Sequence, residues 1–345
     1  MKIRGIYSIV WGVFFLGVAI AGQEAALRLA MPSVNPAHHI RFIREHGDLP
    51  MLGPANRTYQ QIKNTGDYDV TVHFNRYGLR ESQDIAQATA QDLFLVGDSF
   101  AFGWGVEESD RVSHRLAELS GVRVFNPSIT GNFDTYEKLL DYAAAQGANV
   151  QNVIIMVTME NDLAMYTQAR PQKQARKSDA PKPVNTDLMS IKEFLMANSA
   201  LYFALTSGVH RVKWIESLAE KIGLIAANLD DKRRPIPSAA EILSSAERLS
   251  TLAKRFHTTV AIIPSRLLWY GEEKTALDSV HKKFIGLLDK FGVDVIDLRP
   301  AFERLGAPLS LHFHNDPHWT AQGHRVAAQA IARHLQTSRA GAAIQ

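Results

Sequence analysis

The fold is decided by the stretch Leu93-Phe94-Leu95-Val96-Gly97-Asp98-Ser99-Phe100, in which an apolar run leads directly into a glycine and two polar residues. Because all residues of Leu93–Val96 are apolar, the run predicts a strand buried on both faces. Gly97 permits a tight turn and close approach of a substrate to the backbone. Since α/β folds place reactive groups at the C-terminal ends of parallel strands, Ser99 is a candidate nucleophile. The alternative is that Ser99 only caps the following helix.

Four further apolar runs repeat this pattern, and helical spacing of apolar residues lies between them. The runs are Val122–Phe125, Val153–Val157, Val260–Ile263 and Val293–Ile296. Alternating strands and helices predict an α/β fold with a parallel sheet covered by helices on both sides. Upstream, alternation within residues 71–80 predicts a short strand up to Phe74 and a turn at Gly78.

A second chemical signal is Asn315-Asp316-Pro317-His318-Trp319, which stands before a helical pattern near the C-terminus. A serine nucleophile needs a histidine to accept its proton and a carboxylate to orient that histidine. Asp316 and His318 can supply both from one turn, and Pro317 restricts the loop. The sequence therefore predicts Ser99, Asp316 and His318 as catalytic residues.

Turn residues follow two other predicted strands. Gly131-Asn132 comes after Phe125, and Asn161-Asp162 comes after Val157. Acyl transfer needs hydrogen-bond donors aimed at the developing oxyanion. The amides of Ser99 and Gly131 and the side chain of Asn161 are candidate donors, although each residue is also an ordinary turn signal.

The N-terminus carries a membrane signal. Lys2 and Arg4 precede a charge-free run at residues 5–23. At about 1.5 Å per residue, this run nearly spans a hydrocarbon core about 30 Å thick. The positive-inside rule then predicts a single-pass anchor with the rest of the chain on the outer side. A cleaved signal peptide is the rival, because Ala19-Ile20-Ala21 resembles a cleavage site. In both cases the globular part is exported.

The composition excludes several kinds of partner and reactive site. The 345-residue chain has 38 Lys and Arg against 35 Asp and Glu, which does not indicate nucleic acid as a partner. It has no cysteine, so disulfides, thiolate metal sites and cysteine nucleophiles are excluded. An insertion at about residues 163–238 is either a cap beside the site or a further core helix. It includes a basic, proline-containing stretch at 170–183 and a predicted helix at 191–224.

Taken together, the blocks resemble the SGNH/GDSL hydrolase family over about residues 70–337. Gly97-Asp98-Ser99-Phe100 looks like the first block, Gly131 and Asn161 match the second and third, and Asp316 with His318 matches the last. The resemblance implies a three-layer α/β/α sandwich with about five parallel strands, the catalytic and oxyanion roles given above, and no cofactor or metal. One departure is Met159, which stands where the third block usually has glycine.

The resemblance implies an ester hydrolase or an acyltransferase, and a single anchor with the domain outside suits an envelope glycan or lipid acyl ester as the substrate. The alternative is an O-acetyltransferase of an exported polysaccharide. A second alternative is a non-catalytic glycan-binding module. A metal hydrolase is a third interpretation, suggested by His312, His314, Asp316 and His318, although their spacing is one residue too long for the usual cluster. The predicted domains are an anchor at 1–30, a lead-in at 31–90, the SGNH domain at 91–337 and a flexible tail at 338–345.

Overall fold

The computed structural model describes residues 2–31, 43–46, 49–63, 65–166, 194–195, 198–212, 214–215, 217–218 and 236–342. Contacts divide the chain into two compact units. One unit comprises Met1–Ile40, Tyr59–Asp69 and Ala175–Ala227, and the other comprises Arg41–Thr58, Val70–Gln174 and Asn228–Gln345. The basic stretch at 170–183 lies outside the described residues, as does part of the predicted helix at 191–224.

The larger unit is built on a five-stranded sheet in the order β6-β5-β7-β8-β9, with every pairing parallel. Its strands are β5 (Leu93–Val96), β6 (Val124–Phe125), β7 (Asn152–Thr158), β8 (His257–Ile263) and β9 (Asp294–Asp297). All five lie at or beside the apolar runs of the sequence. The predicted parallel sheet is confirmed, and β5 lies between β6 and β7.

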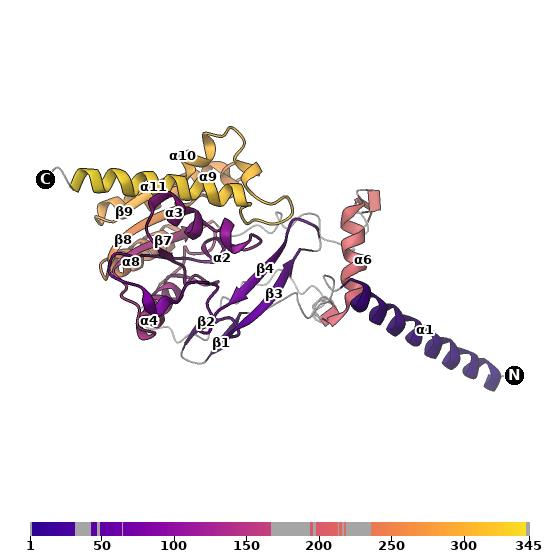
Figure 1. The fold of residues 1–345 in the computed structure, drawn as a ribbon. Coiled ribbons are helices and arrows are strands. Elements are labelled where there is room, and N and C mark those ends of the chain that lie inside the picture. Colours follow the sequence, from indigo (N-terminus) through magenta and orange to yellow (C-terminus); the bar gives the residue numbers. More distant parts are fainter. Residues whose placement is uncertain are drawn as a thin grey trace. The chain divides into compact units, whose positions relative to one another are not determined.

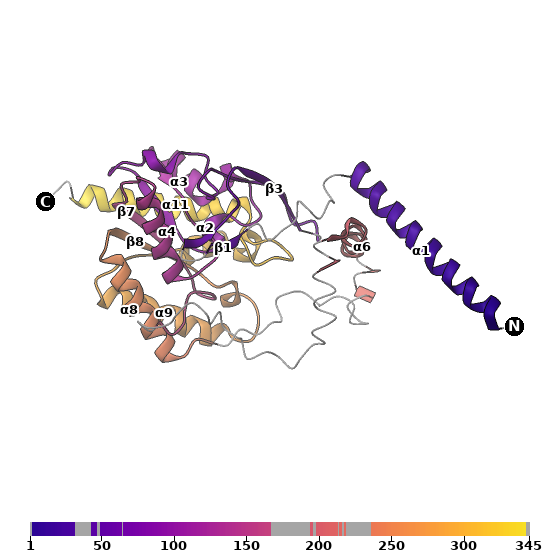
Figure 2. The ribbon, with the colours of Figure 1, turned by 90° about the horizontal axis from the view of Figure 1, so that it is seen from below.

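Helices cover both faces of this sheet, as the two views in Figures 1 and 2 show. They are α2 (Ser99–Phe102), α3 (Val112–Ser120), α4 (Phe133–Ala145), α8 (Ala239–Ala253), α9 (Lys274–Lys290), α10 (Arg299–Glu303) and α11 (Ala321–Ala342). Leu93 and Leu95 of β5 belong to a buried cluster with residues of α3, α10 and α11. On the other face, α8 packs beside α9 and α4. The predicted three-layer α/β/α sandwich is therefore confirmed.

Short elements surround this core. Strands β1 (Arg44–His46) and β2 (Leu49–Leu52) pair antiparallel, and β3 (Arg57–Ile62) pairs with β4 (Asp69–Phe74). Buried and exposed residues alternate along β4, and Gly78 has a positive φ of 71°. The strand and turn predicted here are confirmed. Three-residue and four-residue 3₁₀ turns lie at Ile85–Gln87, Glu108–Asp110, Arg266–Leu268 and Pro308–Leu311.

The described part of the smaller unit includes the helices α1 (Lys2–Ala30) and α6 (Ala200–Arg211). Within α1, Val10–Ala30 is long and apolar enough to cross a membrane, and no residue of its most apolar window is buried. No breaker interrupts α1 at Ala19-Ile20-Ala21, where the sequence resembles a cleavage site. The α6 helix is shorter than the predicted 191–224 helix, of which the other residues are described only in part.

Candidate active site

Ser99 is the first residue of α2, at the C-terminal end of β5. Asp98 caps the helix, because its side chain accepts a hydrogen bond from the amide of Phe100 at 3.0 Å. A Cβ atom at position 97 would lie 2.8 Å from the carbonyl oxygen of Met156 in β7. Gly97 is therefore required by the close approach of two adjacent strands, and it lets the chain turn at the sheet edge where Ser99 stands.

His318 and Asp316 lie in the loop before α11, and the structure brings both to Ser99. The Nε2 atom of His318 lies 2.7 Å from Oγ of Ser99, and its Nδ1 atom lies 2.5 Å from Oδ1 of Asp316. The same carboxylate oxygen accepts the backbone amide of His318 at 3.1 Å. Because an ionised carboxylate only accepts, Nδ1 carries the proton and Nε2 is left to accept from the Ser99 hydroxyl.

Aromatic rings hold the imidazole of His318 from two sides. The ring of Phe100 lies 5.0 Å from it between centroids, and the ring of Trp104 stacks on it at 5.8 Å. Trp319, next to His318 in the chain, is fully buried and contacts Phe100 edge-on. Since packing fixes these neighbours, the histidine is held in one orientation towards Ser99.

Asn161 follows β7 and is hydrogen-bonded to the block that carries the serine. Its Nδ2 atom donates to Oδ2 of Asp98 at 2.8 Å, and the hydroxyl of Thr158 donates to Oδ1 of Asp98 at 2.9 Å. Burial raises the pKa of the Asp98 carboxyl, whereas the hydrogen bond from Asn161 lowers it. Asp98 thus fixes the side chain of Asn161, a role that the sequence interpretation missed although Asp98 stands inside its first block.

Met159 causes no backbone distortion before Asn161. Among the described residues, Asn56 is the one non-glycine residue with a positive φ, so the backbone at Met159 does not need glycine. The Met159 side chain is buried instead. Gly131 lies beyond β6, just before the Asn132 cap of α4, and a Cβ atom there would lie 2.5 Å from the side chain of Thr135.

Asp162 points into the core, unlike its neighbour Asn161. Its carboxylate accepts the amide of Thr158 at 2.8 Å and the hydroxyl of Tyr136 at 2.8 Å. Burial first, and the nearby Asp98 second, raise the pKa of Asp162 well above its usual value. Asp162 therefore supports the turn after β7, and nothing in its contacts directs it at a substrate.

Arg80, the last residue of the stretch 71–80, stabilises the loop that follows Ser99. Its guanidinium donates to the carbonyl oxygens of Gly103 and Val106, both at 2.6 Å, and the side chain is 1% exposed. Burial lowers the pKa of Arg80 to about 9. Because these hydrogen bonds go to carbonyl oxygens, Arg80 fixes the geometry of the loop, and the charges of Glu108 and Glu107 offset part of the lowering of its pKa.

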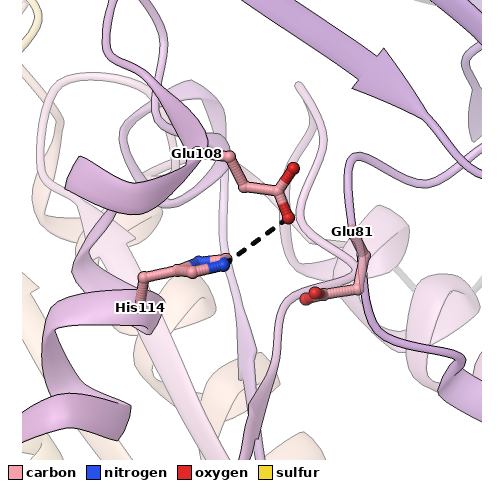
Figure 3. Close-up of side chains that lie close together, drawn as sticks. All are labelled: Glu81, Glu108 and His114. Carbon is pink, nitrogen blue, oxygen red and sulfur yellow. Dashed lines mark ion pairs between the residues drawn. The ribbon is translucent and has the colours of Figure 1, made fainter.

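Among the described residues, one group of carboxylate and imidazole side chains converges closely enough to hold a metal ion. It consists of Glu81, Glu108 and His114, whose ligand atoms lie within 4.8 Å of one another (Figure 3). Glu81 already accepts the amides of Asn126 and Gln83, and the buried Arg111 attracts its charge. A neighbouring arginine repels a cation, so these residues fit a buried charge network.

The histidines of the alternative metal interpretation are not part of this group. His312 is buried with its Nδ1 atom 3.3 Å from the carbonyl oxygen of Pro308, and burial lowers its pKa to about 4. His314 is exposed. Among the side chains that the structure describes, His312, His314, Asp316 and His318 do not converge as ligands. The geometry instead joins Asp316 and His318 to Ser99.

Comparison with known families adds an independent finding. Residues 228–345 match the model of a family described as "SGNH hydrolase-like domain, acetyltransferase AlgX". Over these residues the chain is similar to an SGNH hydrolase-like domain. The matched region of this domain includes Asp316 and His318, while Ser99 lies outside it. No curated protein matches the chain in sequence.

Solved structures of similar proteins include esterases and lipolytic enzymes. A lipase/acylhydrolase from Enterococcus faecalis is 12% identical with a TM-score of 0.40, over 72% of this chain and 96% of that one. The acetylxylan esterase Axe2 from Geobacillus stearothermophilus is 13% identical with a TM-score of 0.38, over 72% and 94%. A member of the lipolytic G-D-S-L family from Veillonella parvula is 9% identical with a TM-score of 0.39, over 70% and 96%.

Proposed function

We propose that this SGNH-domain protein is a serine enzyme that acts on ester bonds through an acyl-serine intermediate. The observation that carries the proposal is the 2.7 Å distance between Oγ of Ser99 and Nε2 of His318, together with the contact of His318 to Asp316. Nucleophile, base and orienting carboxylate are the groups that acyl transfer to serine requires.

In the proposed reaction, Oγ of Ser99 attacks the ester carbonyl carbon and its proton passes to Nε2 of His318. Asp316 stabilises the imidazolium that forms. The protonated histidine then gives the proton to the leaving alcohol, and the acyl group stays on Ser99. A second hydroxyl compound, activated by the same histidine, attacks the acyl-serine and regenerates the enzyme. The amides of Ser99 and Gly131 and the side chain of Asn161 are the proposed donors to the oxyanion.

The second hydroxyl compound distinguishes two forms of this function. Water gives a hydrolase of acyl esters on an envelope glycan or lipid. A sugar hydroxyl gives an O-acetyltransferase of an exported polysaccharide, and the match to the AlgX acetyltransferase model over Asp316 and His318 favours this form. Incubation with an acetyl ester in the presence and absence of oligosaccharide acceptors, followed by mass spectrometry, separates acetylated sugar from free acetate.

The serine assignment is tested with the full chain and a fluorophosphonate probe. Ser99→Ala should abolish labelling and lower kcat on nitrophenyl acetate by roughly 10⁴–10⁶-fold. Ser310→Ala is the matched control, because that exposed hydroxyl only donates to the carbonyl oxygen of Ala307, and it should label like wild type. A folded Ser99→Ala variant with normal turnover would reject the proposal. Failure of wild type to label would favour the glycan-binding module, and loss of activity to a chelator would favour a metal enzyme.

We further propose that α1 is a retained single-pass anchor, with the enzyme domain on the outer side of the membrane. The support is the charge-free run at residues 5–23 of α1, which follows the basic residues Lys2 and Arg4 and overlaps the candidate membrane span Val10–Ala30. The protein should sediment with membranes and resist alkaline extraction. A mature N-terminus near Gly22, found by intact-mass analysis, would contradict the anchor and favour a cleaved signal peptide.

A further inference from the structure

The end of α1 is joined to α6 by a charged residue of the apolar helix. Glu24 accepts hydrogen bonds from the backbone amides of Ala200 and Leu201, at 2.8 and 2.9 Å, and from the hydroxyl of Ser199 at 3.0 Å. These are groups of the first turn of α6, which a carboxylate stabilises because helix N-termini carry unpaired amides and partial positive charge. Figure 1 shows α6 beside this end of α1.

A second contact joins the same two segments. Nη2 of Arg28 donates to the carbonyl oxygen of Asn198 at 2.7 Å, and its guanidinium also pairs with Glu24 one turn earlier. Glu24 directly follows the charge-free run at residues 5–23, which is about as long as the hydrocarbon core is thick. With α1 across a bilayer, the start of α6 would therefore lie at the level of the lipid head groups.

The α6 helix has one buried face, and an exposed leucine lies opposite it. Ala200, Phe203 and Ser207, at spacing i, i+3 and i+7, are buried. Leu205 is two residues from both Phe203 and Ser207, so it points to the opposite side, and it is 61% exposed. Large apolar side chains flanking α6 are exposed as well, namely Phe194, Val212, Trp214 and Leu218.

We propose that Leu205 of α6, together with the exposed side chains of Phe194, Trp214 and Leu218 that flank this helix in the sequence, contacts the surface of the phospholipid bilayer that α1 crosses. The bilayer is favoured as the occupant because α6 is hydrogen-bonded to the point where the apolar run of α1 ends. Exposed apolar side chains on and next to a helix, with tryptophan among them, are typical of segments at the membrane interface. The contact would hold α6 against the membrane. It goes beyond ester chemistry and rests on the proposed anchor.

The absence of cysteine allows single-site labelling of the full chain. The Leu205→Cys variant is labelled with an environment-sensitive fluorophore and placed in nanodiscs of phosphatidylethanolamine and phosphatidylglycerol. Solutes can reach both faces of such a nanodisc. Leu119→Cys is the matched control, because Leu119 is also an exposed leucine on a helix and belongs to the enzyme domain. Phe15→Cys in α1 reports the anchor itself, and Trp214→Cys replaces Leu205→Cys if that variant does not fold.

Nitroxide groups on the lipid acyl chains should quench the probe at position 205 several-fold more than at 119, and iodide should quench 119 several-fold more than 205. Equal quenching at the two positions would overturn the contact. If the probe at position 205 is shielded from iodide but is not quenched by nitroxide, the proposed contact with the bilayer is also overturned, because protein rather than lipid would then cover this position. No nitroxide quenching at position 15 would overturn the anchor and the contact together. None of these readouts depends on esterase activity, so they are independent of the assignment of Ser99.

Glu24→Ala tests the junction between the two helices. Without the carboxylate cap, nitroxide quenching at position 205 should fall while quenching at position 15 stays unchanged. Unchanged quenching at 205 would overturn the role of Glu24 in holding α6 at the membrane.

Discussion

Two histidines six positions apart, His318 and His324, occupy opposite surroundings. His318 lies in the loop before α11, and both of its ring nitrogens have polar neighbours, Asp316 and Ser99. His324 lies in the first turns of α11 and is completely buried. Neither of its ring nitrogens has a hydrogen-bond partner among the described residues, and its ring packs edge-on against Trp319 at 5.6 Å.

The difference shows that residue type alone does not identify a reactive group. Burial lowers the pKa of His324 to about 3, and the positive charges of Arg111 and Arg80 act in the same direction. At neutral pH that imidazole is therefore an uncharged packing element. The side chain of His318 remains 15% exposed and pairs with the carboxylate of Asp316. A general base becomes protonated during the reaction, and a neighbouring carboxylate stabilises that protonated form.

The largest expected effect on kcat comes from removing His318, and its size separates the role of His318 from that of Asp316. His318→Ala should lower kcat by roughly 10⁵–10⁶-fold because no group then accepts the serine proton, and Asp316→Asn should lower it by roughly 10⁴-fold because only orientation and charge stabilisation are lost. Steady-state kinetics on nitrophenyl acetate measure both. His334→Ala, on the following helix α11 and paired at the surface with Asp294, is the control and should keep wild-type kcat. A dispensable His318 would show that the base has been misassigned.

A smaller effect is expected at Asn161. If its amide donates to the oxyanion, Asn161→Ala should lower kcat by roughly 10²–10³-fold, about 2.7–4 kcal/mol, with little change in Tm. Asp98→Asn should reproduce part of this loss, because Asp98 accepts from Asn161 and fixes its side chain. A variant that melts earlier but turns over normally would make Asn161 a turn residue, with a cost of about 1 kcal/mol in the free energy of unfolding.

The smallest effect on activity is expected at His324, where the readout is stability against pH. The folded pKa of about 3 lies below the ordinary 6.5, so the unfolded chain binds more protons in that window. The free energy of unfolding should therefore fall as pH decreases from about 6.5 towards 3, by up to about 1.4 kcal/mol per pH unit from this group. Denaturant titration should show that the free energy of unfolding falls less between pH 7 and pH 5 for His324→Leu than for wild type. An identical loss in both would place the acid sensitivity elsewhere.

Much of the fold could be predicted from local sequence. Buried parallel strands are apolar on nearly every residue, so β5 and β7 were recognisable from runs such as Leu93–Val96 and Val153–Val157. The pairing of Asp316 with His318 is also local, because two residues of one loop make it. Boundaries were less accurate where few residues form a strand, as at β6, which is limited to Val124–Phe125.

The sequence by itself determined the sheet, the reactive residue types and the apolar N-terminal helix, because each depends on neighbouring residues and their periodicity. Only the tertiary structure decided that Asp98 holds Asn161, that Arg80 braces the loop after Ser99, and that Glu24 caps a helix 175 positions further along the chain. Such contacts depend on which strand ends and loops packing brings together, and periodicity carries no information about them. For the same reason, His318 and His324 could be told apart by their surroundings only after the chain had folded around them.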